Sequence, residues 1–542
     1  MKSNLLKVFS AVVVLSLLMI ACGASGPDGS VTPVDKLNIF GDYQIKTAFD
    51  DTGIIKYCSK ETGIDVNIDY GSSTTLRVLN SQKAAYDAYW ATSTIFLVNG
   101  GNQVYTAKSV IGIGTYDAVI ARNGWDPKNL NLRQVLDAAA ARNINWTMVN
   151  PSQGDPSASF LIASYTKMVD ETMLTQEGLN RLPLDYLKAS FGTLLQASDN
   201  IDVLSEEILK DRISGANQFD TYVLYEATVI QLNRELVKAG LEPIKFMYIR
   251  DASTAGKFPI TFTGGDNTRA AYGTFTNCLL GEFAVKTLGG NGYRTTQFGM
   301  SQPDADLSVF NPDWGIEATG ADLRLIDFPL PDVTLNALDT FQTSLKPWQR
   351  SAMCFDVSQS MQGDGEKQLD QAAVLMFNQG NALINGLSIG PNDAYSVFSF
   401  AEDVRLLGTV YGSDKGSVTA MSDAVVNESL RGGTAMFDCV YQAVTYLTSD
   451  PNYPAYDPNQ WIYTVYVMTD GDTNSGWDYN NFESWYNGLP QHQKIRIIAV
   501  GFGGVNDSDG SPMIKMVNLS KGVYFDGRQN LVETLKRALS NY

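Results

Sequence analysis

The stretch M-C-F-D-V-S-Q-S-M, residues 353 to 361, ends an apolar run with three oxygen-bearing side chains. These side chains belong to Asp356, Ser358 and Ser360, which lie at alternate positions. Side chains two residues apart in an extended segment point to the same side, so one carboxylate and two hydroxyls can converge just past the end of a buried strand. The stretch therefore predicts one part of a site for a hard divalent cation.

Two later stretches supply matching parts of such a site. R-G-G-T-A-M-F-D (431–438) carries Thr434, and V-M-T-D-G-D (467–472) is a second apolar strand that ends in an acid, Asp470, and a glycine. Each fragment alone is common in turns. Their order and their placement at strand ends predict a metal site made of Asp356, Ser358, Ser360, Thr434 and Asp470.

In this order the residues resemble the metal-ion-dependent adhesion site of von Willebrand factor A domains. The resemblance implies that Ser358, Ser360 and Thr434 coordinate Mg²⁺ directly or through water, that the carboxylates also hold it, and that Ca²⁺ and Mn²⁺ are alternatives. A protein partner that offers an acidic side chain would then supply the last ligand. Gln359 stands where bacterial members usually have glycine, which leaves the conformation of this loop open.

No catalytic machinery accompanies the cluster in the sequence. Lewis-acid catalysis would need a general base nearby, and the single histidine, His492, lies in a polar Q-H-Q loop where we expect it to be solvated. A hydrolase would also need a nucleophile and base constellation, which we do not find in the sequence. We therefore expect that the protein is not an enzyme.

Residues 349–542 are predicted to form a doubly wound, mostly parallel von Willebrand factor A (Rossmann-like) domain of the α/β class. Near-continuous apolar strands indicate a sheet that is covered on both faces. Asp356 and Asp470 then fall at the carboxyl ends of strands, where such sheets bind ligands. The expected strands are 352–355, 395–400, 461–468, 495–502 and 522–525, and the expected helices are 366–386, 435–447, 482–489 and 531–540.

Residues 1–21 are predicted to be a lipoprotein signal peptide, because two lysines precede an apolar run that is short for a membrane span. The sequence before Cys22 resembles the bacterial lipobox, which implies cleavage there and lipid attachment to Cys22. An ordinary secretory signal with an incidental cysteine is the alternative. Residues 22–34 would be a lipidated tether. The protein would then be lipid-anchored in the cell envelope, on the outer face of the plasma membrane or in the periplasm or outer membrane.

Residues 35–327 alternate short apolar strands with amphipathic helices, which indicates an α/β architecture. The stretches G-S-S-T-T (71–75) and N-P-S-Q-G-D-P-S-A-S (150–159) resemble type II periplasmic solute-binding proteins. The resemblance implies a two-lobed periplasmic-binding-protein-like domain, with chain crossings near residues 120 and 255 and a packed connector at 328–348. The expected strands include 36–40, 66–70, 118–122, 145–149 and 222–225, with a helix at 54–62.

Five hydroxyl residues would face the cleft between these lobes. Hydroxyls and backbone N–H groups at helix starts suit a small polar or anionic solute. The alternative is that each residue is a helix N-cap, a position that Ser and Thr favour. The candidates are Ser72, Ser73, Thr74, Ser93 and Ser157.

Composition excludes two further classes of ligand. The 542 residues carry a net charge of −18, which argues against nucleic acid and against bulk electrostatic binding to anionic lipid.

Four cysteines follow Cys22. The sequence leaves open whether Cys58 and Cys278 form a disulfide or remain free thiols. Cys354 and Cys439 are expected to be buried thiols that do not pair with each other.

Two hypotheses from different classes follow. The protein is a surface lipoprotein that captures a protein partner through its metal site, or it is a solute-binding receptor of a transport system with the von Willebrand factor A domain as an accessory. Partner capture that a chelator abolishes would favour the first hypothesis. Tight binding of a small molecule that survives the chelator would favour the second.

Overall fold

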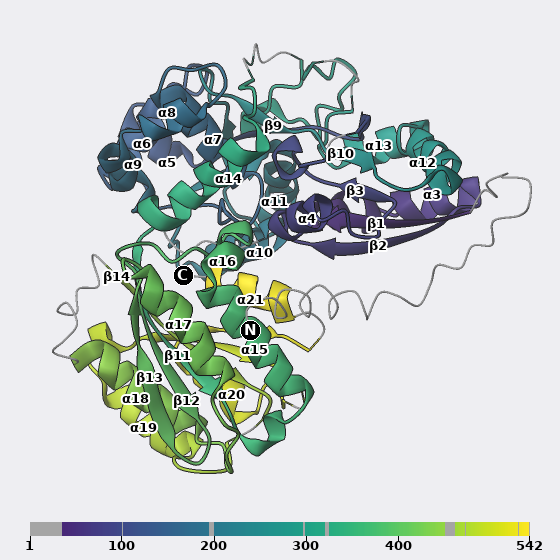
Figure 1. Ribbon diagram of the computed structural model, residues 1–542. Helices are drawn as coiled ribbons and strands as arrows, with labels where there is room; N and C mark the ends of the chain where they lie inside the picture. Colours follow the sequence, from purple (N-terminus) through teal and green to yellow (C-terminus); the bar gives the residue numbers. More distant parts are fainter. Residues whose placement is uncertain are drawn as a thin grey trace, which may run out of the picture.

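The computed structural model describes residues 35–99, 101–194, 200–295, 299–319, 323, 325–449, 461–471, 473–503, 505–528 and 531–540. The predicted signal peptide, Cys22 and the predicted tether lie outside these residues. Figure 1 shows a two-lobed N-terminal part, coloured purple to teal, packed on a C-terminal domain that is coloured green to yellow. The predicted fold class is confirmed, because all three sheets are flanked by helices and the C-terminal sheet is mostly parallel.

The first lobe is built on a five-stranded sheet in the order β2-β1-β3-β10-β4. β1 pairs in parallel with β2 and β3, and β10 is antiparallel to both of its neighbours. The elements of this lobe are β1 (Lys36–Asp42), β2 (Asp65–Gly71), β3 (Ala88–Trp90), β4 (Gln103–Tyr105), β10 (Pro259–Phe262), α2 (Tyr43–Ile45), α3 (Ile54–Thr62), α4 (Ser73–Ser81), α12 (Asp266–Leu279) and α13 (Glu282–Gly290).

The second lobe contains strands in the order β6-β7-β5-β8, with β9 also paired to β5. β5 is antiparallel to β7, β8 and β9. The elements of this lobe are β5 (Ser109–Thr115), β6 (Trp146–Thr147), β7 (Thr221–Tyr225), β8 (Lys245–Met247), β9 (Thr254–Gly256), α5 (Asp117–Asn123), α6 (Leu132–Ala140), α7 (Ser157–Met168), α8 (Gln176–Asn180), α9 (Leu184–Phe191), α10 (Ile201–Ser214) and α11 (Glu226–Lys238).

The chain crosses between the lobes at residues 106–108, between β4 and β5, and returns at 257–258, between β9 and β10. The predicted crossing near 255 agrees with the second of these positions, but the one near 120 is wrong. The predicted strand at 118–122 is also wrong, because these residues form helix α5. A short apolar run fits a buried strand and one side of a helix equally well. The true strand, β5, comes just before it and contains two glycines, so its sequence indicates a strand less clearly.

A packed connector joins the two parts of the molecule. It consists of α14 (Pro331–Thr340) and a π-helical turn at Phe341–Leu345. Ala337, Leu338 and Phe341 are buried in a core that contains residues of both lobes. The connector is therefore packed against the lobes and is not a loose linker.

The C-terminal sheet has six strands in the order β13-β12-β11-β14-β15-β16, and every pair except β12–β13 is parallel. Its strands are β11 (Trp348–Asp356), β12 (Ala394–Phe400), β13 (Val404–Tyr411), β14 (Trp461–Thr469), β15 (Arg496–Gly501) and β16 (Val523–Asp526). Its helices are α15 (Asp364–Phe377), α16 (Gln379–Ile384), α17 (Lys415–Val426), α18 (Met436–Ser449), α19 (Tyr479–Gly488), α20 (Pro512–Leu519) and α21 (Leu531–Ser540).

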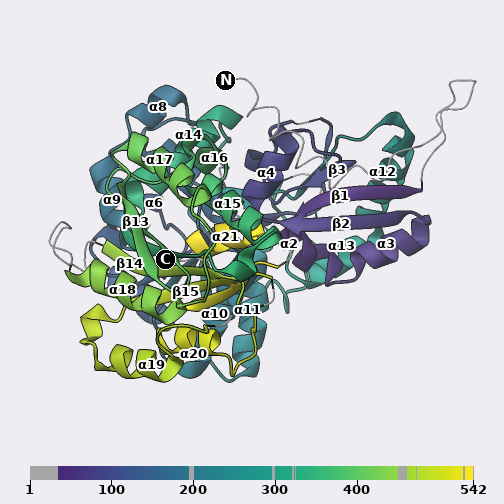
Figure 2. The same cartoon turned by 60° about the horizontal axis from the view of Figure 1, so that its bottom comes forward.

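Helices cover both faces of this sheet, as Figure 2 shows. One core contains Met353 and Phe355 with residues of α15, α17 and α21. The other contains Ala352 and Cys354 with residues of α18, α19 and α20. Neighbouring residues of β11 point to opposite faces, so a strand buried on both sides has to be apolar throughout.

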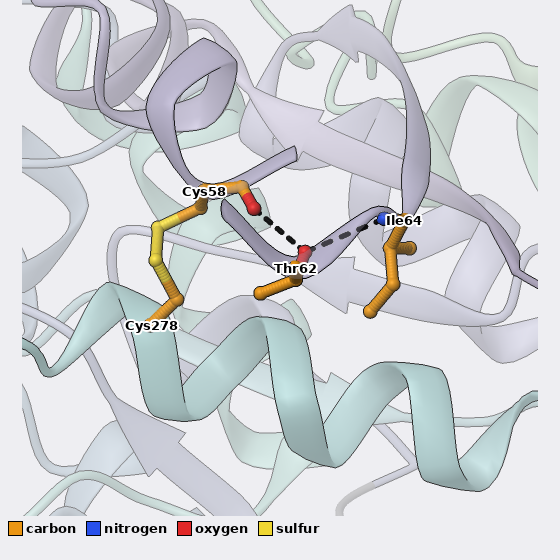
Figure 3. Close-up of a disulfide and its surroundings, with 4 residues drawn as sticks. All are labelled: Cys58, Thr62, Ile64 and Cys278. Carbon is orange, nitrogen blue, oxygen red and sulfur yellow. Dashed lines mark hydrogen bonds between the residues drawn. A yellow bond between two sulfur atoms is a disulfide. The ribbon is translucent and has the colours of Figure 1, made fainter. Parts of the chain in front are cut away.

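Two disulfides are present among the described residues. Figure 3 shows the bond between Cys58 of α3 and Cys278 of α12, which settles the question that the sequence left open. The second bond joins Cys354 of β11 to Cys439 of α18, so the expectation that these two are unpaired thiols was wrong. α18 packs across β11, and this brings the two Cα atoms to 6.1 Å.

Candidate metal centre and interlobe cleft

Asp356, Ser358 and Ser360 lie together where β11 ends. Asp356 is fully buried, and its Oδ1 accepts a hydrogen bond of 2.8 Å from the backbone N–H of Ser358. The hydroxyls of Ser358 and Ser360 lie 2.9 Å apart. Ser358 is buried and Ser360 is exposed, so the group extends from the interior to the surface. The alternate spacing in the sequence thus places all three side chains in one place.

Asp470 joins this group from the end of β14. The Ser360 hydroxyl donates a hydrogen bond of 3.0 Å to Asp470 Oδ1. Thr469, which precedes Asp470, donates from its hydroxyl to Asp356 Oδ2 at 2.5 Å. Adjacent parallel strands end at the same edge of the sheet, and the β11–β14 pair therefore brings together residues more than a hundred positions apart. The role of Thr469 as a partner of Asp356 was not predicted.

Thr434 approaches on a third loop, which hydrogen bonds hold against the other two. Arg431 N donates to Val357 O at 2.8 Å, beside the serine loop. Thr434 N donates to Asn474 Oδ1 at 2.8 Å, and Asn474 N donates back to Thr434 O at 3.1 Å, so Thr434 is fixed to the loop that carries Asp470. The Thr434 side chain is buried. Asn474 is a further supporting residue that the sequence motif did not reveal.

Gly433 allows this loop to approach so closely. Its φ of +76° lies in the left-handed region. A Cβ atom at this position would lie 2.3 Å from Ser475 Oγ and 2.9 Å from Glu402 Cβ. A larger residue would therefore push the Thr434 loop away from Ser475 and Glu402.

The two carboxylates have raised pKa values. Burial raises the pKa of Asp356 to about 6, and the charge of Asp470 acts in the same direction, against the hydrogen bonds from Ser358 and Thr469. Burial also raises the pKa of Asp470. Two acids that are desolvated and close together disfavour each other's charged form, and a bound cation relieves both costs.

The donor set fits a small hard cation. The hydrogen-bonded group offers two carboxylates and the hydroxyls of Ser358 and Ser360, and the Thr434 loop is held against it. Oxygen atoms of this kind are the ligands that Mg²⁺ selects. Among the described residues, no group of three or more His, Cys, Asp and Glu side chains is placed to hold a metal ion. A metal ion bound here would therefore need the hydroxyls as well as the acids.

The predicted solute residues are all buried at or near the contact between the lobes. Ser72 is the N-cap of α4, since its hydroxyl accepts from Thr75 N at 3.2 Å. Ser73 donates to Asp42, and Thr74 donates to Ser152 O at 2.6 Å across the cleft. Their hydroxyls are thus occupied within the chain.

Ser93 and Ser157 differ from these three residues. Neither hydroxyl has a hydrogen-bond partner in the described part of the chain, and neither side chain caps a helix. Ser93 precedes a short 3₁₀ turn in the first lobe, and Ser157 begins α7 in the second. The N-cap alternative therefore holds for Ser72 and does not hold for Ser93 or Ser157.

The interior of the cleft is acidic. Asp42 and Asp155 line one small cavity together with Gln44 and Ser73. Burial raises the pKa of Asp42 to about 7, and the nearby charge of Asp155 adds to this effect. Burial also raises the pKa of Asp155, which accepts hydrogen bonds from Ser159 and Tyr225. Burial favours the neutral form of both acids, so their charge does not decide between a polar and an anionic solute in this cavity.

No protein-family model matches the chain, and no curated protein matches it. Among solved structures, it is similar to the periplasmic binding protein P5PA over 57% of this chain and 99% of that one, with 10% identity and a TM-score of 0.39. It is similar to the periplasmic binding protein AfuA from Actinobacillus pleuropneumoniae, over 57% and 98%, with 11% identity and a TM-score of 0.41. It is also similar to a von Willebrand factor type A protein from Catenulispora acidiphila, over 36% and 43%, with 17% identity and a TM-score of 0.29. Likenesses this distant do not identify what the chain binds.

Proposed function

We propose that this protein captures a protein partner through a divalent metal ion held at the end of the C-terminal sheet. The observation that carries this proposal is the hydrogen-bonded group of Asp356, Ser358, Ser360 and Asp470, which three separate stretches of sequence build together with Thr434. We assign the protein no enzymatic role.

The metal would be held by the hydroxyls of Ser358, Ser360 and Thr434 and by the carboxylates of Asp356 and Asp470, directly or through water. Mg²⁺ is the first choice, and Ca²⁺ and Mn²⁺ are alternatives. When bound, the ion supplies an open coordination position that accepts a carboxylate oxygen from the partner. Because Ser360 is exposed and Asp470 is half-buried, the partner can reach this position from solvent.

We also propose that the protein works outside the cytoplasm, attached by lipid on Cys22. Two disulfides in a chain of this size support an oxidising compartment. Among the described residues, no helix has the length and apolar character needed to span a bilayer. Attachment would then depend on the lipid.

A second candidate function is that of a solute-binding receptor of a transport system. The observation that favours it is the pair of α/β lobes, with buried hydroxyls of Ser93 and Ser157 that have no hydrogen-bond partner among the described residues. Its ligand would be a small polar or anionic solute.

Capture of partners from a cell-surface extract tests the proposed function. We expect the wild-type protein to retain a partner in Mg²⁺ and to lose it after chelation, and we expect Asp470→Ala to retain none in either condition. Asp423→Asn, which changes an exposed acid on α17, is the matched control and should behave as wild type. The same proteins retained in every lane would contradict metal-dependent capture. A small molecule that binds tightly after chelation would instead support the receptor function.

A further inference from the structure

A carboxylate from the C-terminal domain lies at the start of α4 in the first lobe. Glu533 of α21 is only 5% exposed. Its Oε1 accepts a hydrogen bond of 2.9 Å from Ser72 N, and its Oε2 accepts from the hydroxyls of Ser72, at 3.4 Å, and Thr75. The N-terminus of a helix carries free N–H groups and a partial positive charge, so it is a natural position for a carboxylate.

Basic groups surround the same position. Lys536, one turn after Glu533, is buried and donates to Thr75 Oγ1 at 2.7 Å. Arg77 of α4 is also buried and donates from Nη2 to Ile384 O at 2.9 Å. Its Nη1 has no partner among the described residues. Charge as well as hydrogen bonding therefore suits an acid at this place.

The second lobe contacts the same part of the C-terminal domain. Gln153 Nε2 donates to Asn385 O at 2.9 Å and to Gly386 O at 3.1 Å. A Cβ atom at Gly386 would lie 2.6 Å from Ser152 O, so the turn after α16 is pressed against this loop. Figure 1 shows α16 and α21 together at this junction. The C-terminal domain thus binds both lobes at once.

The lobes also contact each other at this junction, which makes the state a closed one. Thr74 donates from its N–H to Gln153 O at 3.3 Å and from its hydroxyl to Ser152 O at 2.6 Å. Farther along the cleft, Thr47 of the first lobe donates to Asp202 of the second at 2.6 Å. Opening the lobes would require the loop at Gln153 and the start of α4 to part while both remain bound to the C-terminal domain.

We infer that Ser72 and Thr75, with Arg77 beside them, form a carboxylate-binding cradle whose occupant is Glu533 of the same chain, and that α21 latches the two lobes in the closed state. The mouth of the cleft is then a docking site for the C-terminal domain. Release of α21 precedes any opening of the cleft to solvent. This inference goes beyond the metal-dependent capture proposed above and does not depend on it.

Distances between spin labels on the two lobes of the full mature chain test the latch. Lys60 of α3 and Lys210 of α10 are exposed and lie on different lobes, and Lys60→Cys with Lys210→Cys supplies the labels. We expect one narrow distance distribution in the otherwise wild-type chain. Glu533→Gln removes the charge and keeps the size, and it should broaden and shift this distribution by more than its original width. Glu242→Gln makes the same chemical change at an exposed site in the second lobe and should leave it unchanged.

Thr75→Val tests the contact from the side of the lobe and does not alter the C-terminal domain. It should shift the distribution in the same direction as Glu533→Gln. Wild-type distributions in both variants would overturn the latch, and so would an equal shift in Glu242→Gln.

Acetate tests the cradle itself. In Glu533→Ala the position is vacated, and acetate titrated into this variant should bind there; because acetate is not attached to α21, it should not restore the closed label distance. The wild-type chain, whose cradle is filled, should take up no acetate. Failure of acetate to bind Glu533→Ala would overturn the assignment of a carboxylate site. Mg²⁺ binding measured on the same variants should equal that of the wild type, so this outcome is separate from any failure of the metal site.

Discussion

The end of the C-terminal sheet and the mouth of the interlobe cleft both gather hydroxyls around carboxylates, but they differ in what can reach them. At the sheet, Ser360 is exposed and Asp470 is half-buried, and the acids keep raised pKa values that a cation would relieve. At the cleft, Ser72 and Thr75 already bind Glu533 of the same chain. The polar groups at the cleft are bound by a carboxylate of the same chain, so this site serves as a contact within the protein. The acids at the sheet have raised pKa values and lie near the surface, so that site is available to an outside ligand.

The largest effect we expect is loss of metal-dependent stability in Asp356→Ala. A ligand present at about 1,000 times its Kd stabilises the folded state by about 4 kcal/mol, so saturating Mg²⁺ should raise the Tm of the wild type. Asp356→Ala removes a buried ligand and should show no rise, as measured by calorimetry with and without Mg²⁺. Ser72→Ala, at the cleft, should keep the wild-type rise. If Mg²⁺ raised the Tm of Asp356→Ala as much as that of the wild type, the end of the sheet would not be the metal site.

The gathering of Asp356, Ser358, Ser360 and Asp470 could be predicted because most of its signal is local. Asp356, Ser358 and Ser360 lie within five positions at the end of a long apolar strand, and the rule for parallel sheets brings Asp470 to the same edge. α21 was also predicted with the observed bounds, 531–540. The contact of α21 with the start of α4 was not predicted, because Glu533 and Ser72 lie 461 positions apart and no pattern in either segment indicates the other.

The errors have equally physical causes. β13 (Val404–Tyr411) was missed because it is a partly exposed edge strand without regular alternation, and its register with β12 shifts between Val397 and Phe398. The predicted helix 366–386 breaks at Asn378, which adopts an extended conformation and caps α16 with its own side chain. The Cys354–Cys439 bond depends on how α18 crosses β11, which is a property of packing rather than of spacing.

The second largest effect concerns the two disulfides, which provide a matched pair for the comparison. Loss of a native disulfide typically costs about 2–5 kcal/mol in small secreted domains, so both double variants, Cys354→Ser with Cys439→Ser and Cys58→Ser with Cys278→Ser, should lower the free energy of unfolding. Cys354 lies two residues before Asp356, and Cys439 lies on the helix after Thr434. Only the first double variant should therefore weaken Mg²⁺ binding. Equal Mg²⁺ affinity in both, measured by titration calorimetry, would show that the bond does not support the metal loops.

A pH titration tests the environment of Lys536 at the mouth of the cleft. Burial lowers the pKa of Lys536 from 10.5 to about 8, so between these values the unfolded chain binds more protons than the folded one. The contribution of Lys536 to the free energy of unfolding should then rise as the pH increases from about 8 to 10.5. The rise should be about 3 kcal/mol at most, because each unit of pKa difference corresponds to about 1.4 kcal/mol. The free energy of unfolding of the wild type minus that of Lys536→Met should follow this rise in denaturant titrations. A difference that is constant with pH would contradict a buried, titrating Lys536 at the latch.

The smallest effect we expect is that of Thr469→Val. This substitution removes the hydrogen bond to Asp356 Oδ2 without changing any of the five proposed ligands. Supporting residues of this kind typically contribute about 10- to 100-fold to metal affinity, so Mg²⁺ should bind more weakly by about this factor. Thr448→Val on α18, whose hydroxyl bonds only within its own helix, should leave the affinity unchanged and is the control.

Binding of Mn²⁺ to the purified mature protein, followed by electron paramagnetic resonance, tests whether the end of the C-terminal sheet holds a metal ion. We expect one ion bound per chain, displaced by excess Mg²⁺, and no bound ion in Asp356→Ala or Asp470→Ala. An absence of bound Mn²⁺ at millimolar concentration in the wild type would contradict the metal centre, and so would equal binding in the two variants.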